Sequence, residues 1–231
     1  MKFIPSFSGG KDSTAMLHVM LKARMPIHSV VYFDTGWEFP HMLDHLTEVE
    51  KRTGIEIIRV KFHTTFDDLL PRYGWPSWNR RWCTERKIRT IKQYAKKHDA
   101  VECIGFAYDE IKRLNATVLS RPAYFPLIAR KITEADALKM CYKIGYTWGG
   151  LYEHFNRVSC YCCPLQRKGE LRKIKEFYPE IWSRMLTMGA TLPAPKNRFG
   201  DYDTLAEKDK EFSLALKQRS LALHITRKVQ N

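Results

Sequence analysis

The chain has 231 residues, 44% of them hydrophobic and 28% charged, with a formal net charge of +14. These proportions are ordinary for a globular protein and exclude a disordered, collagen-like or coiled-coil chain. The length suits one main domain with an appendage. No run approaches the ~18 consecutive apolar residues of a membrane span, and no long apolar h-region marks the N-terminus, so we expect a cytoplasmic protein with no membrane partner.

The positive charge is spread along the chain. Residues 1–100 hold 17 Lys and Arg against 11 Asp and Glu, and the remainder holds 22 against 14. A distributed excess of this size is typical of a protein that binds a polyanion or a phosphate-rich ligand, because Lys and Arg neutralise phosphates and release counterions. A basic bias that serves only solubility is the alternative.

The N-terminal half alternates between strand and helix patterns. Strands are predicted at 2–7, 28–33, 55–62 and 100–106, and helices at 14–24, 41–52 and 84–97. Residues 63–83, with two prolines and three tryptophans, are too broken for a regular element. The alternation predicts a parallel sheet covered by helices on both faces, with ligands at the carboxyl ends of the strands.

The pattern changes in the C-terminal half. A surface loop is predicted at 108–124, a fifth short strand at 125–129, and a helix that starts at about 133 with acidic residues near its positive end. From Gly149 onward the strand signal stops. There follow a cysteine-bearing loop, a helix near 168–188, a Pro-rich linker and a charged helix at about 202–223.

These elements predict an α/β fold with a doubly wound, parallel five-stranded sheet, a cysteine-bearing loop and a helical C-terminal extension. The expected domains are 1–150, which binds a nucleotide, and 151–231, which holds the cysteine loop and the helical region packed on it.

The first strand runs into the helix through Ser8-Gly9-Gly10-Lys11-Asp12-Ser13. The glycines let backbone N–H groups turn toward an anion, and the helix N-terminus adds partial positive charge. The serines add hydroxyl groups and Lys11 adds a charge. The spacing differs from that of nucleoside triphosphatase loops and of dinucleotide folds. The hexapeptide therefore predicts a pyrophosphate site with a different nucleotide chemistry, and a glycine turn without a ligand is the alternative.

This hexapeptide resembles the pyrophosphate loop of the adenine nucleotide alpha-hydrolase superfamily, whose Rossmann-like members cleave ATP between the α and β phosphates or bind phosphoadenylyl sulfate. Further segments resemble the phosphoadenylyl sulfate reductase-like branch, over roughly residues 3–170. They are Asp34-Thr35-Gly36-Trp37-Glu38-Phe39-Pro40, Arg81-Trp82-Cys83-Thr84 with Lys87, Gly105 with Asp109, Glu110 and Arg113, and Phe125-Pro126-Leu127. The chain is also similar to the ATP-pyrophosphatase component of DNA phosphorothioation systems.

The resemblance implies an adenine nucleotide as ligand, with ATP and Mg²⁺ as cofactors. The implied catalytic residues are Lys11, Asp12, Ser13 and Lys87. The implied nucleotide-binding residues are Ser8, Gly9, Gly10, Lys11, Asp12, Ser13, Asp34, Thr35, Gly36, Glu38, Gly105, Glu110 and Arg113. Asp12 or Asp34 is expected to organise Mg²⁺.

Two departures from the family pattern affect the function. The family often has Arg two positions after the glycine, where this chain has Ala107, and a contact to an extra phosphate or sulfate is thereby put in doubt. Reductases of the family carry a catalytic cysteine in a Glu-Cys-Gly-x-His tail, whereas this chain has no cysteine after Cys163. Thiol-based sulfate reduction therefore lacks its nucleophile.

Three of the six cysteines lie in Cys160-Tyr161-Cys162-Cys163. A Cys-x-x-Cys spacing lets two thiolates reach one metal centre, and iron–sulfur relatives share the Cys-Thr and Cys-x-x-Cys-Pro segments. We expect Cys83, Cys160 and Cys163, with Cys162 as the fourth candidate, to hold a 4Fe-4S cluster. Zinc and a structural loop are the alternatives, and Cys103 and Cys141 are expected in the core. Three ligands would leave one iron open to hold a sulfide, and four would close the cluster.

Basic and aromatic residues gather in two segments. Trp75, Trp78 and Trp82 are interleaved with or followed by Arg80, Arg81, Arg86, Lys87, Arg89, Lys92, Lys96 and Lys97. Arg167, Lys168, Arg172, Lys173 and Lys175 follow the cysteines. Such groups suit a nucleotide or a strand of nucleic acid, although solvated helix faces explain them as well.

The leading functional hypothesis is an ATP pyrophosphatase that adenylates an oxygen on a nucleic acid, so that sulfur can displace AMP. DNA phosphorothioation and tRNA thiolation both remain open, with DNA slightly preferred. The expected partners are an adenine nucleotide, a nucleic acid and a sulfur donor such as a cysteine desulfurase, and a homodimer is possible. The alternatives are a phosphoadenylyl sulfate or adenylyl sulfate reductase and a non-catalytic subunit that binds nucleotide and cluster.

Overall fold

The computed structural model describes residues 1–114, 123–163, 165–200 and 203–230, apart from the side chains of residues 113 and 219–230. The chain divides into two compact units. The first comprises Met1–Thr65 and Cys83–Cys160, and the second comprises Phe66–Trp82 and Tyr161–Asn231. The sequence predicts one boundary after residue 150, whereas the second unit also takes in an earlier segment of the chain.

The first unit is built on a five-stranded sheet in the order β3-β2-β1-β4-β5, and each adjacent pair of strands is parallel. The strands are β1 (Lys2–Phe7), β2 (Val30–Phe33), β3 (Ile57–Val60), β4 (Ala100–Ile104) and β5 (Ala123–Tyr124). This confirms the predicted α/β fold with a parallel sheet. The strand order reverses direction between β1 and β4, and ligands of such sheets bind at the carboxyl ends of the strands beside that point.

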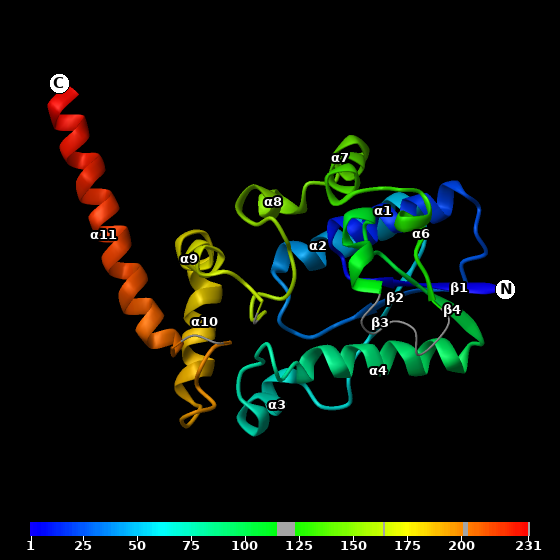
Figure 1. Ribbon diagram of the computed structural model, residues 1–231, viewed down its shortest axis with the longest axis horizontal. Helices are drawn as coiled ribbons and strands as arrows, with labels where there is room; N and C mark the ends of the chain where they lie inside the picture. Colours follow the sequence, from blue (N-terminus) through cyan, green and yellow to red (C-terminus); the bar gives the residue numbers. More distant parts are fainter. Residues whose placement is uncertain (115–122, 164, 201–202, 231) are drawn as a thin grey trace. The chain divides into compact units, whose positions relative to one another are not determined.

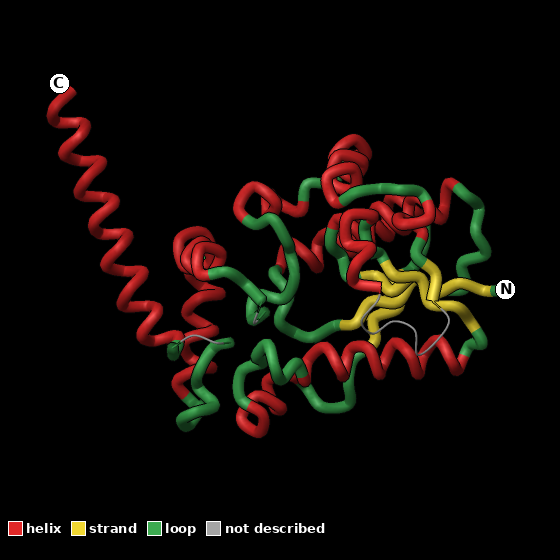
Figure 2. The backbone as a smooth tube through the Cα atoms, viewed as in Figure 1, coloured by secondary structure: helices red, strands yellow, loops and turns green. Residues whose placement is uncertain are grey.

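Helices cover both faces of this sheet. Figures 1 and 2 show α1 (Lys11–Lys22) and α2 (Pro40–Thr53) on one face and α4 (Trp82–Lys97) on the other. Ala95 of α4 packs against Ile4 of β1 and Val31 of β2, and all three side chains are buried. The apolar strands are thus covered on both sides, as is typical of parallel sheets.

The remaining elements of the first unit follow β4. They are η1 (Tyr108–Arg113), α6 (Pro126–Ala129), α7 (Glu134–Ile144), η3 (Trp148–Gly150) and α8 (Leu151–His154). The predicted acidic start of α7 is confirmed, because Thr133 and Asp136 form a capping box there. The helix packs against α1 and thereby brings its N-terminus toward the glycine turn after β1.

The prediction of a strand at 125–129 is wrong. The fifth strand is Ala123–Tyr124, and the residues after it form the short helix α6. Pro126 is the physical reason, because proline lacks the N–H group that a strand ladder needs and its fixed φ suits the first position of a helix.

The second unit is helical in the part of the chain that the structure describes. Its helices are α3 (Phe66–Tyr73), α9 (Lys168–Phe177), α10 (Pro179–Ala190) and α11 (Leu205–Gln230). Two predictions are corrected here, since residues 63–83 contain α3 and the single helix expected at 168–188 is two helices separated at Pro179. Lys175 of α9 and Trp182 of α10 both bond the carboxylate of Asp209 in α11, at 2.7 and 2.6 Å. Within the described ranges, no helix has the length and apolar character of a membrane span.

Candidate nucleotide site

The connection between β1 and α1 is a tight glycine turn. Gly9 has a φ of +77°, a left-handed conformation that favours glycine, and a Cβ at this position would lie 3.0 Å from the terminal methyl carbon of Met42. Gly10 caps α1 with an extended backbone. The first amide groups of α1, and the positive end of its dipole, therefore lie at the carboxyl end of the central strand.

Two serine hydroxyls fix the shape of this turn. The Ser13 hydroxyl donates to the carbonyl oxygen of Gly10 at 3.0 Å and accepts from the backbone N–H of Ser8 at 3.1 Å. The Ser8 and Ser13 hydroxyls also lie 3.0 Å apart. Ser13 is buried, so its hydroxyl acts as an internal brace that holds the two ends of the turn together.

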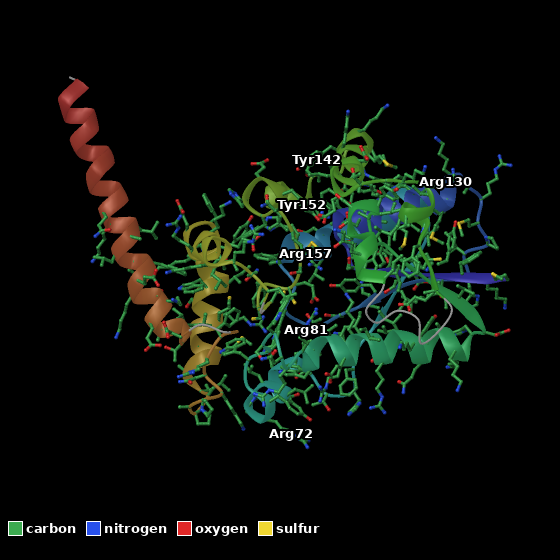
Figure 3. All side chains as sticks on the ribbon, in the orientation of Figure 1. Arg72, Arg81, Arg130, Tyr142, Tyr152 and Arg157 are labelled. Carbon is green, nitrogen blue, oxygen red and sulfur yellow. The ribbon has the colours of Figure 1, made fainter. Side chains whose placement is uncertain are left out.

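Two aromatic side chains from the region after α7 hold the turn from outside. The indole N–H of Trp148 donates to the carbonyl oxygen of Gly9 at 2.7 Å. The backbone N–H of Lys11 donates to the hydroxyl oxygen of Tyr152, also at 2.7 Å, and Tyr152, labelled in Figure 3, belongs to α8. The Tyr152 oxygen thus accepts from an amide group that, in a phosphate-binding turn, faces the anion.

Lys11 is the buried cation of the site, with 4% of its surface exposed. Its ammonium group bonds Glu134, the first residue of α7, at 2.5 Å and Asp12 at 3.3 Å. Burial lowers the pKa of Lys11, but the two carboxylates outweigh burial and raise this pKa above its ordinary value. Lys11 therefore stays charged and available to a phosphate that displaces a carboxylate.

Asp12 is the carboxylate best placed to receive a metal ion. Burial raises its pKa to about 6, against the opposing charge of Lys11. Its Oδ1 atom has no hydrogen-bond partner among the described residues. Asp34, the other predicted Mg²⁺ ligand, is committed differently, because it accepts the N–H of Gly36 at 2.9 Å and pairs with Lys61 at 2.9 Å.

The loop after β2 is held by several hydrogen bonds among its own residues. The Thr35 hydroxyl donates to Glu38 at 2.6 Å, and it accepts the backbone N–H of Trp37 at 3.0 Å. Burial raises the pKa of Glu38, while the bonds from Thr35 and the positive charge of Lys87 on α4 act in the opposite direction. Lys87 is thus brought within electrostatic reach of the loop after β2.

The end of β4 approaches the phosphate turn closely. A Cβ at Gly105 would lie 3.1 Å from backbone atoms of both Asp12 and Ser13, so only glycine lets the two segments meet. Glu110 in η1 lies near enough to help raise the pKa of Asp12, and Asp109 accepts the N–H of Glu134 at 3.1 Å. The predicted ligand-binding side chain of Arg113 lies outside the described residues.

The cysteines predicted to bind metal divide between the two units. Cys83 and Cys160 belong to the first, and Cys162 and Cys163 to the second. Cys160 forms an isolated antiparallel bridge with Glu38, so this thiol lies beside the loop after β2. Pro164, which completes the motif, lies outside the described residues.

The donor set consists of thiols, the ligand type that iron–sulfur clusters take, but the structure does not gather them into a metal site among the described residues. All six cysteines carry thiols rather than disulfides, and Cys83, Cys160 and Cys163 are partly exposed. Within the described ranges, no group of three or more His, Cys, Asp or Glu side chains has the arrangement to hold a metal ion. Cys103 and Cys141 are buried as expected, and burial raises the pKa of each thiol to about 12, so neither offers a thiolate at neutral pH.

The structure brings together most of the sequence-predicted nucleotide residues at the carboxyl ends of β2, β1 and β4. It also shows three residues in contact with the glycine turn that the sequence reasoning missed, namely Glu134, Trp148 and Tyr152. Glu134 is predicted only as an acidic residue at a helix start, and the same signal gives no hint of its ion pair with Lys11. The two aromatic residues lie in a segment with no motif, and only the fold connects them with the turn.

A parallel sheet with a glycine turn at its point of reversal is typical of a nucleotide-binding α/β domain. Comparison with family models gives the particular family. The model of the phosphoadenosine phosphosulfate reductase domain matches residues 2–166. The chain therefore belongs to this family of nucleotide-binding, sulfur-related enzymes.

Curated relatives lie at moderate sequence identity. Two uncharacterized proteins of Methanocaldococcus jannaschii are 32% and 28% identical over 190 residues, which is 78% of this chain. The chain spans only 39% and 45% of their lengths. Sulfate adenylyltransferase subunit 2 of Mycolicibacterium gilvum is 38% identical over 65 residues, covering 26% of this chain and 21% of that protein.

A solved structure shares the fold. The U34-tRNA thiolase NcsA from Methanococcus maripaludis, determined with its 4Fe-4S cluster, superimposes with a TM-score of 0.51. The match covers 92% of this chain and 73% of the thiolase at 16% identity. At that identity the likeness concerns the fold, and it supports the Rossmann-like architecture predicted from the sequence.

Proposed function

We infer that the chain is an ATP pyrophosphatase that adenylates an oxygen of a nucleic-acid acceptor and so prepares it for sulfur incorporation. The observation that carries this proposal is the intact turn after β1. It combines a buried cation at Lys11, the bracing hydroxyl of Ser13 and an Asp12 oxygen with no hydrogen-bond partner among the described residues. Amide groups, a cation and a carboxylate with one uncommitted oxygen together suit a nucleotide phosphate chain with Mg²⁺.

In the proposed first step, the acceptor oxygen attacks the α-phosphorus of ATP. The bond from this phosphorus to the bridging oxygen breaks, and its electron pair leaves with pyrophosphate. Lys11 and the α1 amide groups would stabilise the charge that develops on the departing phosphates, and Asp12 would hold Mg²⁺ there. Nucleotide binding would exchange Glu134 for a phosphate oxygen at the Lys11 ammonium group, and Tyr152 for another at the Lys11 amide.

In the proposed second step, a sulfide-level nucleophile attacks the adenylated atom and AMP departs with the former acceptor oxygen. Sulfur that arrives as HS⁻ needs no further electrons. A cysteine desulfurase delivers a persulfide, so a thiol reductant must supply two electrons to release its outer sulfur as HS⁻ before this step. Cys83, Cys160 and Cys163 would hold a 4Fe-4S cluster, with Cys162 as a fourth ligand. When bound, the cluster would supply a redox-active centre with affinity for sulfur. A nucleobase carbonyl and a backbone phosphate both offer a suitable oxygen.

The test is pyrophosphate release by anaerobically purified protein given ATP and Mg²⁺, with and without RNA or DNA. Ser13→Ala combined with Asp12→Asn should abolish release, because it removes both the brace and the metal ligand. Asp44→Asn removes an exposed carboxylate on α2 and serves as the matched control. Unchanged release in the double variant would exclude the turn from the reaction.

A reductase remains the second candidate, favoured by the family to which the chain belongs. Its distinguishing result is tight binding of phosphoadenylyl sulfate without ATP cleavage, measured by titration of the same preparation. A nucleotide- and cluster-binding subunit without catalysis would bind ATP and release no pyrophosphate under any condition.

A further inference from the structure

The segment Phe66–Trp82 of the second unit holds three tryptophans, and the structure separates them into two kinds. Trp75 and Trp82 are each only 2% exposed. The Trp82 indole donates to the carbonyl oxygen of Gly74 at 3.1 Å, and the Trp75 ring meets Phe199 edge-on at 5.1 Å. These two side chains anchor the segment within its unit.

Trp78 differs from its neighbours, because 62% of its surface is exposed. It lies with Asn79 at the tip of a tight turn, closed by two reciprocal backbone hydrogen bonds of 3.2 Å between Ser77 and Arg80. The Arg80 N–H also lies 3.2 Å from the Ser77 hydroxyl oxygen. A closed turn between two buried tryptophans fixes the backbone at Trp78, so less backbone entropy is lost when a ligand stacks on its ring.

The sequence on either side of Trp78 is basic. Between Asp68 and Glu85 the chain carries three arginines, Arg72, Arg80 and Arg81, and no carboxylate. Figure 3 labels the first and the last of them. The second unit as a whole holds 17 Lys and Arg against 10 Asp and Glu. An exposed aromatic ring in a segment that carries arginines and no carboxylate suits a base attached to a phosphate backbone.

We propose that the Trp78 turn is a contact surface for single-stranded nucleic acid, in which an unpaired base stacks on the indole ring and Arg80 and Arg81 contact the adjacent phosphates. The inference rests on the proposed function, because it assigns a place to the acceptor. Cys83 follows Trp78 by five residues, a reach of at most about 18 Å along extended chain. Trp78 therefore lies close in the sequence to Cys83, one of the thiols proposed to bind the cluster.

The test is fluorescence anisotropy of labelled single-stranded RNA and DNA oligonucleotides with the full chain at fixed salt. Trp78→Ala should weaken binding by about 5- to 100-fold, the range expected for one stacked base. Trp78→Phe should recover most of the affinity. Phe177→Ala, which removes another exposed ring of the second unit, should change it less than about twofold. Arg80→Gln with Arg81→Gln should make the slope of log affinity against log salt concentration shallower, by the amount expected for the loss of about two phosphate contacts.

Three results would overturn the inference: no binding of either oligonucleotide by the unaltered chain, equal affinity of the unaltered chain and Trp78→Ala, or equal losses in Trp78→Ala and Phe177→Ala. Either of the last two results would indicate that the turn contacts a protein partner and not a nucleic acid. Failure of the proposed function is read separately, as absent pyrophosphate release from ATP. Trp78-dependent oligonucleotide binding without pyrophosphate release would support the proposed contact surface and contradict the proposed ATP pyrophosphatase reaction.

Discussion

Asp12 combines an unfavourable environment with a position suited to a metal ion. Burial raises its pKa from 3.8 to about 6, so the folded chain binds this proton more tightly than the unfolded chain does. In the absence of Mg²⁺, the contribution of Asp12 to the free energy of unfolding therefore falls as the pH rises from about 4 to about 6. The buried carboxylate therefore costs stability at neutral pH in the absence of a metal ion.

Asp12→Asn should remove this pH dependence. Relative to the unaltered chain, the variant should gain stability between pH 4 and pH 7, by less than about 3 kcal/mol. The measurement is thermal unfolding of both proteins across this pH range in EDTA. Parallel curves for the two proteins would show that Asp12 titrates as an ordinary surface carboxyl group.

Gly105 is required by the close approach of β4 to the phosphate turn. Gly105→Ala would place a methyl group 3.1 Å from backbone atoms of Asp12 and Ser13, and backbone cannot move aside as a flexible side chain can. We expect a loss of about 1–3 kcal/mol in the free energy of unfolding together with weaker ATP binding, measured by denaturant unfolding and by calorimetry. Gly169→Ala meets no atom within 4 Å and should leave both unchanged.

At this scale the sequence predicts motif residues and misses their distant partners. Lys11, Asp12 and Ser13 are recognisable because they follow one another in a turn with a known physical role. Glu134 and Tyr152 bond Lys11 across 123 and 141 residues of chain. No local pattern encodes such pairs, since they depend on how α7 and α8 pack beside α1.

The short elements η3 and α8 act as a support for the phosphate turn. Trp148 is 1% exposed and donates to the Gly9 carbonyl, and its ring packs against His45 and Tyr152 with centroids 4.4 and 4.8 Å apart. The left-handed backbone at Gly9 needs its carbonyl oxygen held in one direction. The indole therefore positions the turn.

Trp148→Phe should lower the free energy of unfolding by about 1–3 kcal/mol, because it leaves the Gly9 carbonyl without its partner, and should weaken ATP binding several-fold. Trp182→Phe is the matched control, since it removes an indole hydrogen bond in the second unit. It should cost stability without changing ATP affinity. Calorimetric ATP titration of both variants makes the comparison, and equal affinities would deny Trp148 any part in shaping the turn.

Secondary structure was predictable where hydrophobic periodicity is long and unbroken. β1, α1, β2 and α2 fall within a few residues of their predicted positions for this reason. The errors gather at prolines. Pro126 begins α6 where a strand was expected, and Pro179 divides one expected helix into α9 and α10. Residues 63–83 were expected to be irregular, yet α3 forms there with Pro71 inside it, because Leu69, Leu70 and Phe66 bury one face.

For the whole molecule, the division into two units cannot be inferred from the order of the elements alone. The second unit takes Phe66–Trp82 from the middle of the chain because Trp75 of this segment packs against Phe199, and its backbone N–H donates to the carbonyl oxygen of Lys196 at 3.2 Å. Composition predicts a basic protein, but it does not predict that a segment from the middle of the chain belongs to the second unit. The chain consequently passes from the second unit back to the first between Trp82 and Cys83.

Metal loading tests the cysteine assignment on the complete chain. A ligand that binds only the folded state raises its stability by mass action, so iron reconstituted anaerobically should raise the melting temperature, and a chelator should reverse the increase. The variants Cys83→Ser, Cys160→Ser and Cys163→Ser should each lose iron, visible absorbance and the increase in melting temperature. Cys103→Ala, at a buried thiol of β4, should keep all three.

Cys162→Ser separates the two coordination states, because full iron content in this variant means three protein ligands and a reduced content means four. Iron retained in Cys160→Ser and Cys163→Ser alike would exclude a cluster at these thiols, and zinc in place of iron would assign them a structural role instead.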